Sequence, residues 1–204
     1  MTEDDPPDVE STAPSFVTHY YRESRQPFLN LSDLGEGELL EIMSGLIAER
    51  HKGLQHRLFG RKYMAMRRVT EDRLYLRFVE SGGRPERRVP HYFVLGESAW
   101  FRGLASDMVE VRLPLAALPV EQTTVTWTDS FTAMEVDQEF DLPHACAPYH
   151  GQLFYLADIP VLARRYGVPR VGPDQDYAGY EQRAGGSRFV EVQLWSDIPI
   201  REFL

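Results

Sequence analysis

The sequence predicts an α+β domain, with helices in its N-terminal half and a mostly antiparallel sheet in its C-terminal half. Helical periodicity is concentrated before residue 82, and short β-type segments follow residue 88. These segments do not alternate as strand and helix, which a Rossmann-type parallel sheet would require. With 204 residues, of which 43% are hydrophobic, the chain suits one domain with extensions and a substantial core.

The N-terminal segment predicts a tail followed by a strand. Residues 1–14 contain five acidic residues and three prolines, and few large apolar groups that could bury surface. We therefore expect residues 1–14 to form a disordered acidic tail and residues 15–204 to form a single domain. Residues 16–21 (FVTHYY) are rich in β-branched and aromatic side chains, which favours a strand.

Two helices are expected in the N-terminal half. The first begins at Ser32 or Gly35 and ends near Gly53, after basic residues that suit a helix C-terminus. Its apolar residues have the spacing of one buried stripe: Leu39, Ile42, Met43, Leu46 and Ile47. Residues 61–80 fit either a helix or a strand. We interpret them as a helix because methionine, arginine and glutamate are frequent in their first half.

The C-terminal half reads as short strands separated by turns rich in glycine, proline and aspartate. The expected strands are residues 89–95, 109–113, 123–128, 152–156 and 189–195. A helix interrupts them, with Asp158 as its cap and Pro160 in its first turn, and it ends at Gly167.

Charge and cysteine content favour an acidic protein of a reducing compartment, so we expect a cytoplasmic location without a membrane segment. The net charge is −9, which opposes nonspecific binding to nucleic acid. Residues 50–88 nevertheless carry +8, and the rest of the chain carries −17. A local block of this kind can attract an anionic ligand, or it can be a solvated face balanced by acids elsewhere in the fold. The single cysteine, Cys146, excludes an internal disulfide.

Strong local motifs are absent from the sequence. There is no GxGxxG, Walker, GxSxG, HExxH or CxxC pattern, so conventional hydrolases and kinases are disfavoured. His144, Cys146 and His150 lie close together in HACAPYH, but their spacing fits no usual zinc pattern. We expect no metal site there, only a connecting loop.

Four short stretches occur in an order that points to one family. They are Phe16-Val17-Thr18-His19, Val89-Pro90-His91-Tyr92-Phe93, Thr128-Asp129-Ser130-Phe131-Thr132-Ala133 and Val190-Glu191-Val192-Gln193. Together they span most of residues 16–195, and this order resembles that of the DarT-type DNA ADP-ribosyltransferases.

The resemblance implies an ADP-ribosyltransferase-like fold and NAD as the substrate that donates ADP-ribose. It implies a catalytic carboxylate at Glu191, which stabilises an oxocarbenium-like ribose. The residues expected to contact NAD are His19, Tyr20 and Tyr92 near the nicotinamide, and Arg67 or Arg68 on the phosphates. The acceptor of the ADP-ribose is unknown, and nucleic acid is one candidate. The long connection over residues 170–187 precedes the glutamate strand, so Tyr177 and Tyr180 are expected to contact the acceptor by analogy.

A second interpretation stays open for each of these residues. Glu191 fits an edge strand whose polar face meets water, and His19 fits a packed strand residue. The protein would then be a non-catalytic binding module that uses the basic surface of residues 50–88. The two interpretations differ in whether Glu191 lies in a cleft with His19 and the helix arginines.

Overall fold

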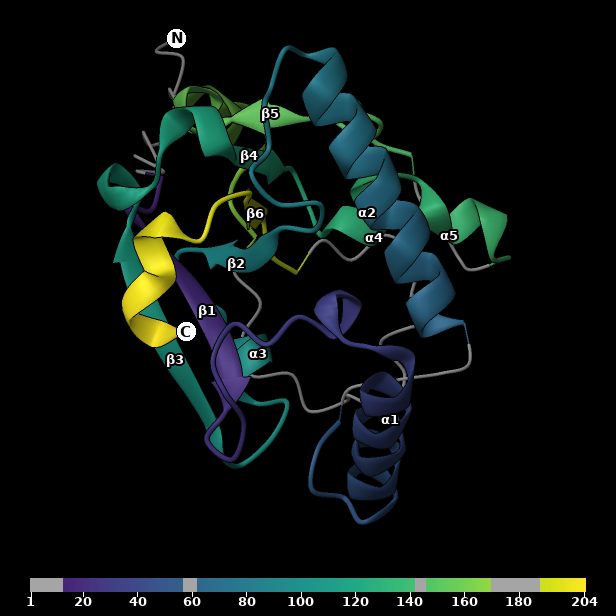
Figure 1. Ribbon diagram of the computed structural model, residues 1–204. Coiled ribbons are helices and arrows are strands. Elements are labelled where there is room, and N and C mark those ends of the chain that lie inside the picture. Colours follow the sequence, from purple (N-terminus) through teal and green to yellow (C-terminus); the bar gives the residue numbers. More distant parts are fainter. Residues whose placement is uncertain (1–12, 57–61, 142–145, 170–187) are drawn as a thin grey trace, which may run out of the picture.

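The chain forms one six-stranded sheet flanked by helices, in a computed structural model that describes residues 13–56, 62–141, 146–169 and 188–204 (Figure 1). The strand order is β3-β1-β2-β6-β4-β5, and every pair is antiparallel. The strands are β1 (Phe16–Arg22), β2 (His91–Leu95), β3 (Met108–Pro114), β4 (Thr123–Thr126), β5 (Phe154–Tyr155) and β6 (Glu191–Leu194). The predicted α+β class, with helices early and an antiparallel sheet, is confirmed.

The strand that carries Glu191 lies inside the sheet. β6 pairs with β2 on one side and with β4 on the other. The interpretation of Glu191 as a residue of an edge strand was therefore wrong. Sequence alternation does not reveal strand order, because an edge strand and a central strand with one polar face have the same pattern.

The helices of the first half are α1 (Glu36–His51) and α2 (Tyr63–Glu80), and the later ones are α3 (Ala99–Arg102), α4 (Ser130–Ala133), α5 (Val136–Glu139) and α6 (Ile159–Tyr166). The ambiguous segment is thus helical. Leu74 and Phe78 of α2 are buried four residues apart, whereas Leu76 between them is exposed. The apparent strand alternation over these three residues was accidental.

The apolar stripe expected on α1 is only partly buried. Leu39 is buried, but Ile47 is 41% exposed. Ile42 and Leu46 face a cavity instead of a packed core. The spacing of the apolar residues predicted the helix correctly, but it predicted burial of more of their side chains than the core contains.

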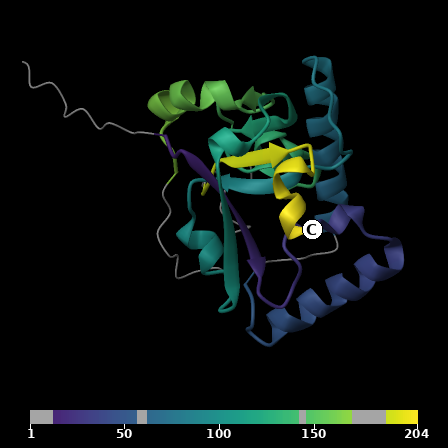
Figure 2. The same ribbon diagram turned by 60° about the vertical axis from the view of Figure 1, so that its left-hand side comes forward.

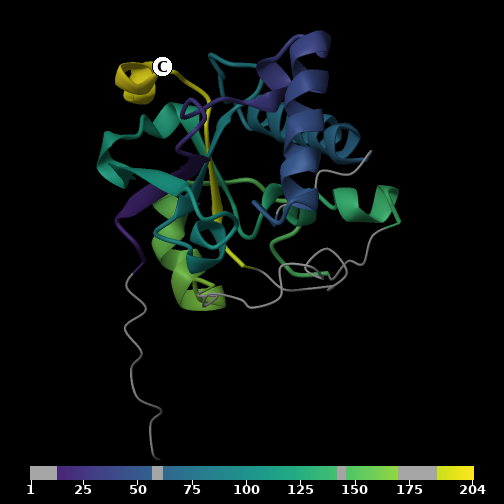
Figure 3. The ribbon, with the colours of Figure 1, turned by 90° about the horizontal axis from the view of Figure 1, so that it is seen from below.

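Two cores lie on opposite faces of the sheet. On one face, Leu74 and Phe78 of α2 pack with Trp195. On the other face, Ile159 and Leu162 of α6 pack with residues of the strands and with the 3₁₀ helix η6 (Ile198–Phe203). Figures 2 and 3 show this layering, with α1 and α2 on one side of β6 and α6 on the other.

The N-terminal boundary of the folded part differs slightly from the prediction. Ala13 packs against the core, and the ring of Pro14 lies beside Gly96, although both residues were assigned to the tail. Residues 1–12 are outside the described part of the chain. Among the described residues, no helix combines the length and the apolar character needed to cross a bilayer.

Candidate functional site

A cavity opens where β1 separates from β2. β1 pairs with β3 along seven residues but with β2 at only two, Val17 and Thr18. Beyond Thr18 the two strands diverge, and a cavity of about 240 Å³ lies beside this split. Its wall is completed by α1, α2 and the segment before α1. A concave, mostly apolar space with a few polar groups is the usual form of a ligand site.

The cavity collects residues that are distant in sequence. Five of the residues predicted for the site line it: His19 and Tyr20 from β1, Arg67 from α2, Tyr92 from β2 and Glu191 from β6.

Glu191 is held at the start of β6, with Val94 and Thr126 as its neighbours across the sheet. Its Oε2 accepts a hydrogen bond from the backbone N–H of Ser130 at 3.0 Å. Burial, together with the nearby charge of Asp129, raises the pKa of Glu191 to about 7, against the opposing effects of the Ser130 hydrogen bonds and Arg67. The carboxyl group therefore changes charge near neutral pH.

Arg67 offers hydrogen-bond donors to the cavity from a fixed position. Its Nε donates to Glu71 Oε1 at 3.0 Å, and its terminal nitrogens donate to the Tyr63 hydroxyl and to Asn30 Oδ1, each also at 3.0 Å. Because a guanidinium has five N–H donors, one N–H on each terminal nitrogen has no partner among the described residues. The arginine is thus anchored and still able to bind an anion.

Tyr92 and Glu71 support this arginine. The guanidinium lies over the Tyr92 ring, 4.9 Å from its centroid, and the Tyr92 hydroxyl donates to Glu71 Oε1 at 3.4 Å. Burial raises the pKa of Glu71, while the charge of Arg67 lowers it. The sequence analysis missed Glu71, although its spacing four residues after Arg67 is the signal of a helical ion pair.

His19 bridges the split between the strands. Its Nδ1 lies 2.9 Å from the Tyr92 carbonyl oxygen, and its Nε2 accepts from the backbone N–H of Phe28 at 3.0 Å. Since a carbonyl only accepts and a backbone N–H only donates, the ring must be neutral with its proton on Nδ1. Burial lowers the pKa of His19 to about 4, against the opposing effect of the Tyr92 carbonyl, which agrees with a neutral ring. Both nitrogens are occupied, so the ring can offer a ligand only its carbon edge or its face.

Tyr20 is also held by a hydrogen bond and by ring stacking, and it lines the cavity. Its hydroxyl accepts from the Ser98 N–H at 2.8 Å, and its ring stacks on Phe101 at 5.5 Å between centroids. Burial raises the pKa of Tyr20, so the hydroxyl stays protonated at neutral pH. It lines the cavity as an aromatic wall.

Two strained residues flank the site. Phe28 has a φ of 59° and Thr128 a φ of 128°, and neither is a glycine. Phe28 stacks on the His19 ring at 4.2 Å, and the carbonyl oxygen of Thr128 accepts from the Glu191 N–H at 3.3 Å. Unfavourable backbone of this kind persists only where its surroundings enforce it, and it gathers at functional sites.

Arg68 does not share the position of Arg67. It is exposed and is absent from the cavity wall. Successive residues of a helix point about 100° apart, and the side of α2 that lines the cavity carries Tyr63, Arg67 and Thr70. Arg68 is therefore not placed to contact a ligand inside this cavity, and its expected contact with the phosphates of NAD stays a prediction. Tyr177 and Tyr180 lie outside the described residues.

Part of the basic block of residues 50–88 is paired with acids. Besides Arg67, Arg73 pairs with Glu139 and Arg88 with Asp72. Arg87 bridges Asp33 and Asp197. These four arginines are balanced within the fold, whereas the other described lysines and arginines of the block are in no ion pair with a described residue.

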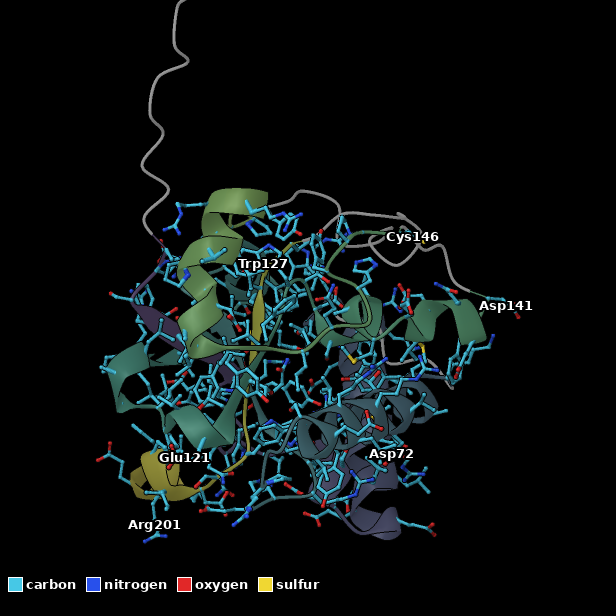
Figure 4. The ribbon with its side chains drawn as sticks, turned by 90° about the horizontal axis from the view of Figure 1, so that it is seen from above. Asp72, Glu121, Trp127, Asp141, Cys146 and Arg201 are labelled. Carbon is cyan, nitrogen blue, oxygen red and sulfur yellow. The ribbon has the colours of Figure 1, made fainter. Side chains whose placement is uncertain are left out.

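The described residues contain no group of three or more histidine, cysteine, aspartate or glutamate side chains arranged for a metal ion. His144 of the HACAPYH segment lies outside them. Cys146 is exposed at the edge of the molecule, whereas Trp127 lies inside it (Figure 4).

Comparisons with protein-family models, with curated proteins and with solved structures find no match to this chain. The geometry of the cavity is therefore the basis for a functional proposal.

Proposed function

We propose that this protein is an NAD-dependent mono-ADP-ribosyltransferase-like enzyme with Glu191 as its catalytic carboxylate. The observation that carries the proposal is that one cavity joins Glu191 with Arg67, Tyr92 and His19. An ADP-ribosyltransferase-like fold belongs to the same proposal. Its support is the order of the segments around His19, Tyr92 and Glu191, which lie on adjacent or nearby strands of one sheet.

The residues have the chemistry that this reaction needs. When the N-glycosidic bond of NAD breaks, nicotinamide leaves with the bonding electrons and positive charge develops on the ribose. An ionised Glu191 stabilises that charge, and an acceptor nucleophile then attacks the ribose carbon and loses its proton. Tyr92 and Tyr20 supply aromatic surface for the nicotinamide ring, and Arg67 supplies two N–H donors for the pyrophosphate.

The size of the cavity defines which part of NAD it encloses. A volume of about 240 Å³ is below the roughly 300–1,000 Å³ of pockets for drug-sized ligands. The described wall thus suits the nicotinamide ring and its ribose. The adenosine half would extend beyond it.

Replacing Glu191 with glutamine tests the proposal. Glu191→Gln keeps size and hydrogen bonding but removes the charge that acts in the transition state, so NAD turnover should fall at least 100-fold, on the order of other losses of electrostatic stabilisation. NAD affinity, measured by calorimetry, should change much less. The matched control is Glu121→Gln, because Glu121 is exposed and lies outside the cavity wall.

Two results would contradict the enzyme hypothesis. Equal turnover in Glu191→Gln and wild type would exclude Glu191 from catalysis. If NAD does not raise the melting temperature of the wild type, the wild type does not bind NAD, and NAD is excluded as its substrate.

The alternative is a non-catalytic module that binds an anionic partner, with nucleic acid as one candidate. It is favoured by Arg68 and Arg77 on α2, which are exposed and have no ion pair among the described residues. In that case, Arg68→Glu with Arg77→Glu should abolish salt-dependent binding of a single-stranded oligonucleotide. Glu191→Gln should leave that binding unchanged.

A further inference from the structure

The turn at residues 128–130 holds Glu191 at two points. The Glu191 N–H donates to the carbonyl oxygen of Thr128 at 3.3 Å, and the Ser130 N–H donates to Glu191 Oε2 at 3.0 Å. The first bond fixes the backbone of Glu191 and the second fixes its carboxylate. Because both partners belong to one turn, the direction of the side chain depends on the shape of that turn.

The turn is itself fixed by side-chain hydrogen bonds. Thr126 Oγ1 donates to the Thr128 carbonyl oxygen at 3.0 Å. Asp129 Oδ1 accepts from the Thr132 N–H at 3.1 Å, which caps the short helix α4 that begins at Ser130. The φ of 128° at Thr128 is unusual for a β-branched residue, so these bonds must compensate for strain.

Charged and titratable groups face Glu191 from three neighbouring elements. Asp129 comes from the turn, Arg67 from α2 and Tyr92 from β2. His19 of β1 lines the same cavity and is neutral. After burial, which has the largest effect, the negative charge of Asp129 raises the pKa of Glu191, whereas the Ser130 hydrogen bonds and Arg67 lower it.

We infer that Asp129 is a positioning residue for Glu191. The Asp129 carboxylate caps the turn that holds Ser130 against Glu191, and its negative charge acts directly on the Glu191 carboxylate. The structural part of this inference is independent of the reaction. Its consequence for turnover rests on the proposed function.

Carbon NMR of the glutamate carboxyl groups tests the structural part without any activity. The Glu191 resonance is assigned by its absence in Glu191→Gln, and its titration midpoint is compared between variants. Asp129→Asn keeps a good cap but loses the charge, and Asp129→Ala loses both. Asp158→Asn and Asp158→Ala are the matched controls, because Asp158 also accepts from a backbone N–H, that of Tyr155 at 2.8 Å, and lies outside the cavity wall.

Asp129→Asn should lower the Glu191 midpoint by on the order of half a pH unit, because a like charge is removed. Asp129→Ala should give a higher midpoint than Asp129→Asn, because the Ser130 donors then move away from the carboxylate. Both Asp158 variants should match the wild type. If Asp129→Ala does not fold, Asp129→Gly replaces it, since glycine suits a cap position.

Identical midpoints in Asp129→Asn and Asp158→Asn would refute the electrostatic part. Identical midpoints in Asp129→Ala and Asp129→Asn would refute the positioning part. In turnover of NAD, Asp129→Ala should lower kcat at least 10-fold with a smaller change in KM, on the order of a lost transition-state interaction. If the wild type does not turn over NAD, the proposed function fails, while the NMR midpoints still decide the role of Asp129.

Discussion

At the scale of single residues, the candidate site keeps an ionisable carboxyl group where its charge is costly. Glu191 lies on a central strand, partly buried between Val94 and Thr126. Its pKa of about 7 means that the folded protein disfavours the ionised form relative to the unfolded chain. Such a cost is retained in proteins where activity depends on the group.

This cost predicts a gain in stability when the charge is removed. The pKa of this carboxyl group is higher in the folded protein than in the unfolded chain. Its contribution to the free energy of unfolding is therefore fully present below the unfolded pKa, and it is lost as the pH rises through the folded pKa of about 7. Glu191→Gln should therefore be more stable than wild type by roughly 1–3 kcal/mol at pH 8. The difference should shrink toward pH 5, where Glu191 is protonated in the folded state.

Urea unfolding at pH 5 and pH 8 provides the measurement, with Glu121→Gln as the exposed control. A Glu191→Gln variant that is less stable than wild type at pH 8 would mean that the carboxylate has stronger partners than Ser130.

At the scale of elements, α2 combines packing and chemistry on one side. Leu74 and Phe78 pack against the sheet, and one turn earlier Arg67 and Glu71 present a buried ion pair beside the cavity. The side chain of Arg67 is 14% exposed and that of Glu71 is 3% exposed. Removing one partner would leave the other as an uncompensated charge in a poorly hydrated place.

We therefore expect different outcomes for neighbouring arginines of α2. Arg67→Gln should cost about 3–5 kcal/mol of unfolding free energy, the usual effect of breaking a buried ion pair. The double variant Arg67→Gln with Glu71→Gln should recover at least half of that loss, because no lone charge remains. Arg68→Gln, which removes the same charge from an exposed position, should stay within about 0.5 kcal/mol of wild type.

Chemical denaturation of the wild type and these three variants measures the losses, and the single variant Glu71→Gln completes the cycle that gives the coupling energy of the pair. Equal losses in Arg67→Gln and Arg68→Gln would show that Arg67 is not effectively buried, and would also weaken its assignment as an anchored phosphate ligand.

At the scale of the whole molecule, the cavity exists because α1 stands over the split of the sheet without filling it. Ile42 and Leu46 of α1 line the cavity, and only Leu39 of this helix is buried in the ordinary sense. Leu40, on the same helix, is 70% exposed and outside the cavity wall. A larger side chain can therefore be placed on the side of α1 that lines the cavity with little effect on the rest of the core.

Leu46→Trp should fill the cavity and lower NAD affinity at least 10-fold, since the ligand and the indole would compete for a volume of about 240 Å³. Leu40→Trp adds the same bulk outside and should bind NAD as the wild type does. Calorimetric titration with NAD is the measurement, with circular dichroism as the check on folding. Unchanged affinity in Leu46→Trp would place NAD elsewhere on the protein.

Much of the architecture could be predicted from local patterns. The strand at Phe16, the helix after Gly35, the helix ending at Gly167 and the antiparallel sheet all follow from spacing, caps and breakers, which act within a few residues. Strand limits were less accurate. The strand expected to reach residue 128 ends at Thr126, because Thr128 adopts a positive φ that no local pattern announces.

The candidate site could be predicted only in part. The sequence by itself determined the α+β class and provided Glu191, Arg67 and Tyr92 as candidates, because residue types and their order lie within the chain. Only the tertiary structure decided that these side chains share a cavity, that Arg68 does not, and that Glu71 and Ser130 hold the key groups in place. The reason is physical: strand order and helix rotation depend on contacts between distant segments, and no periodicity within one segment encodes them.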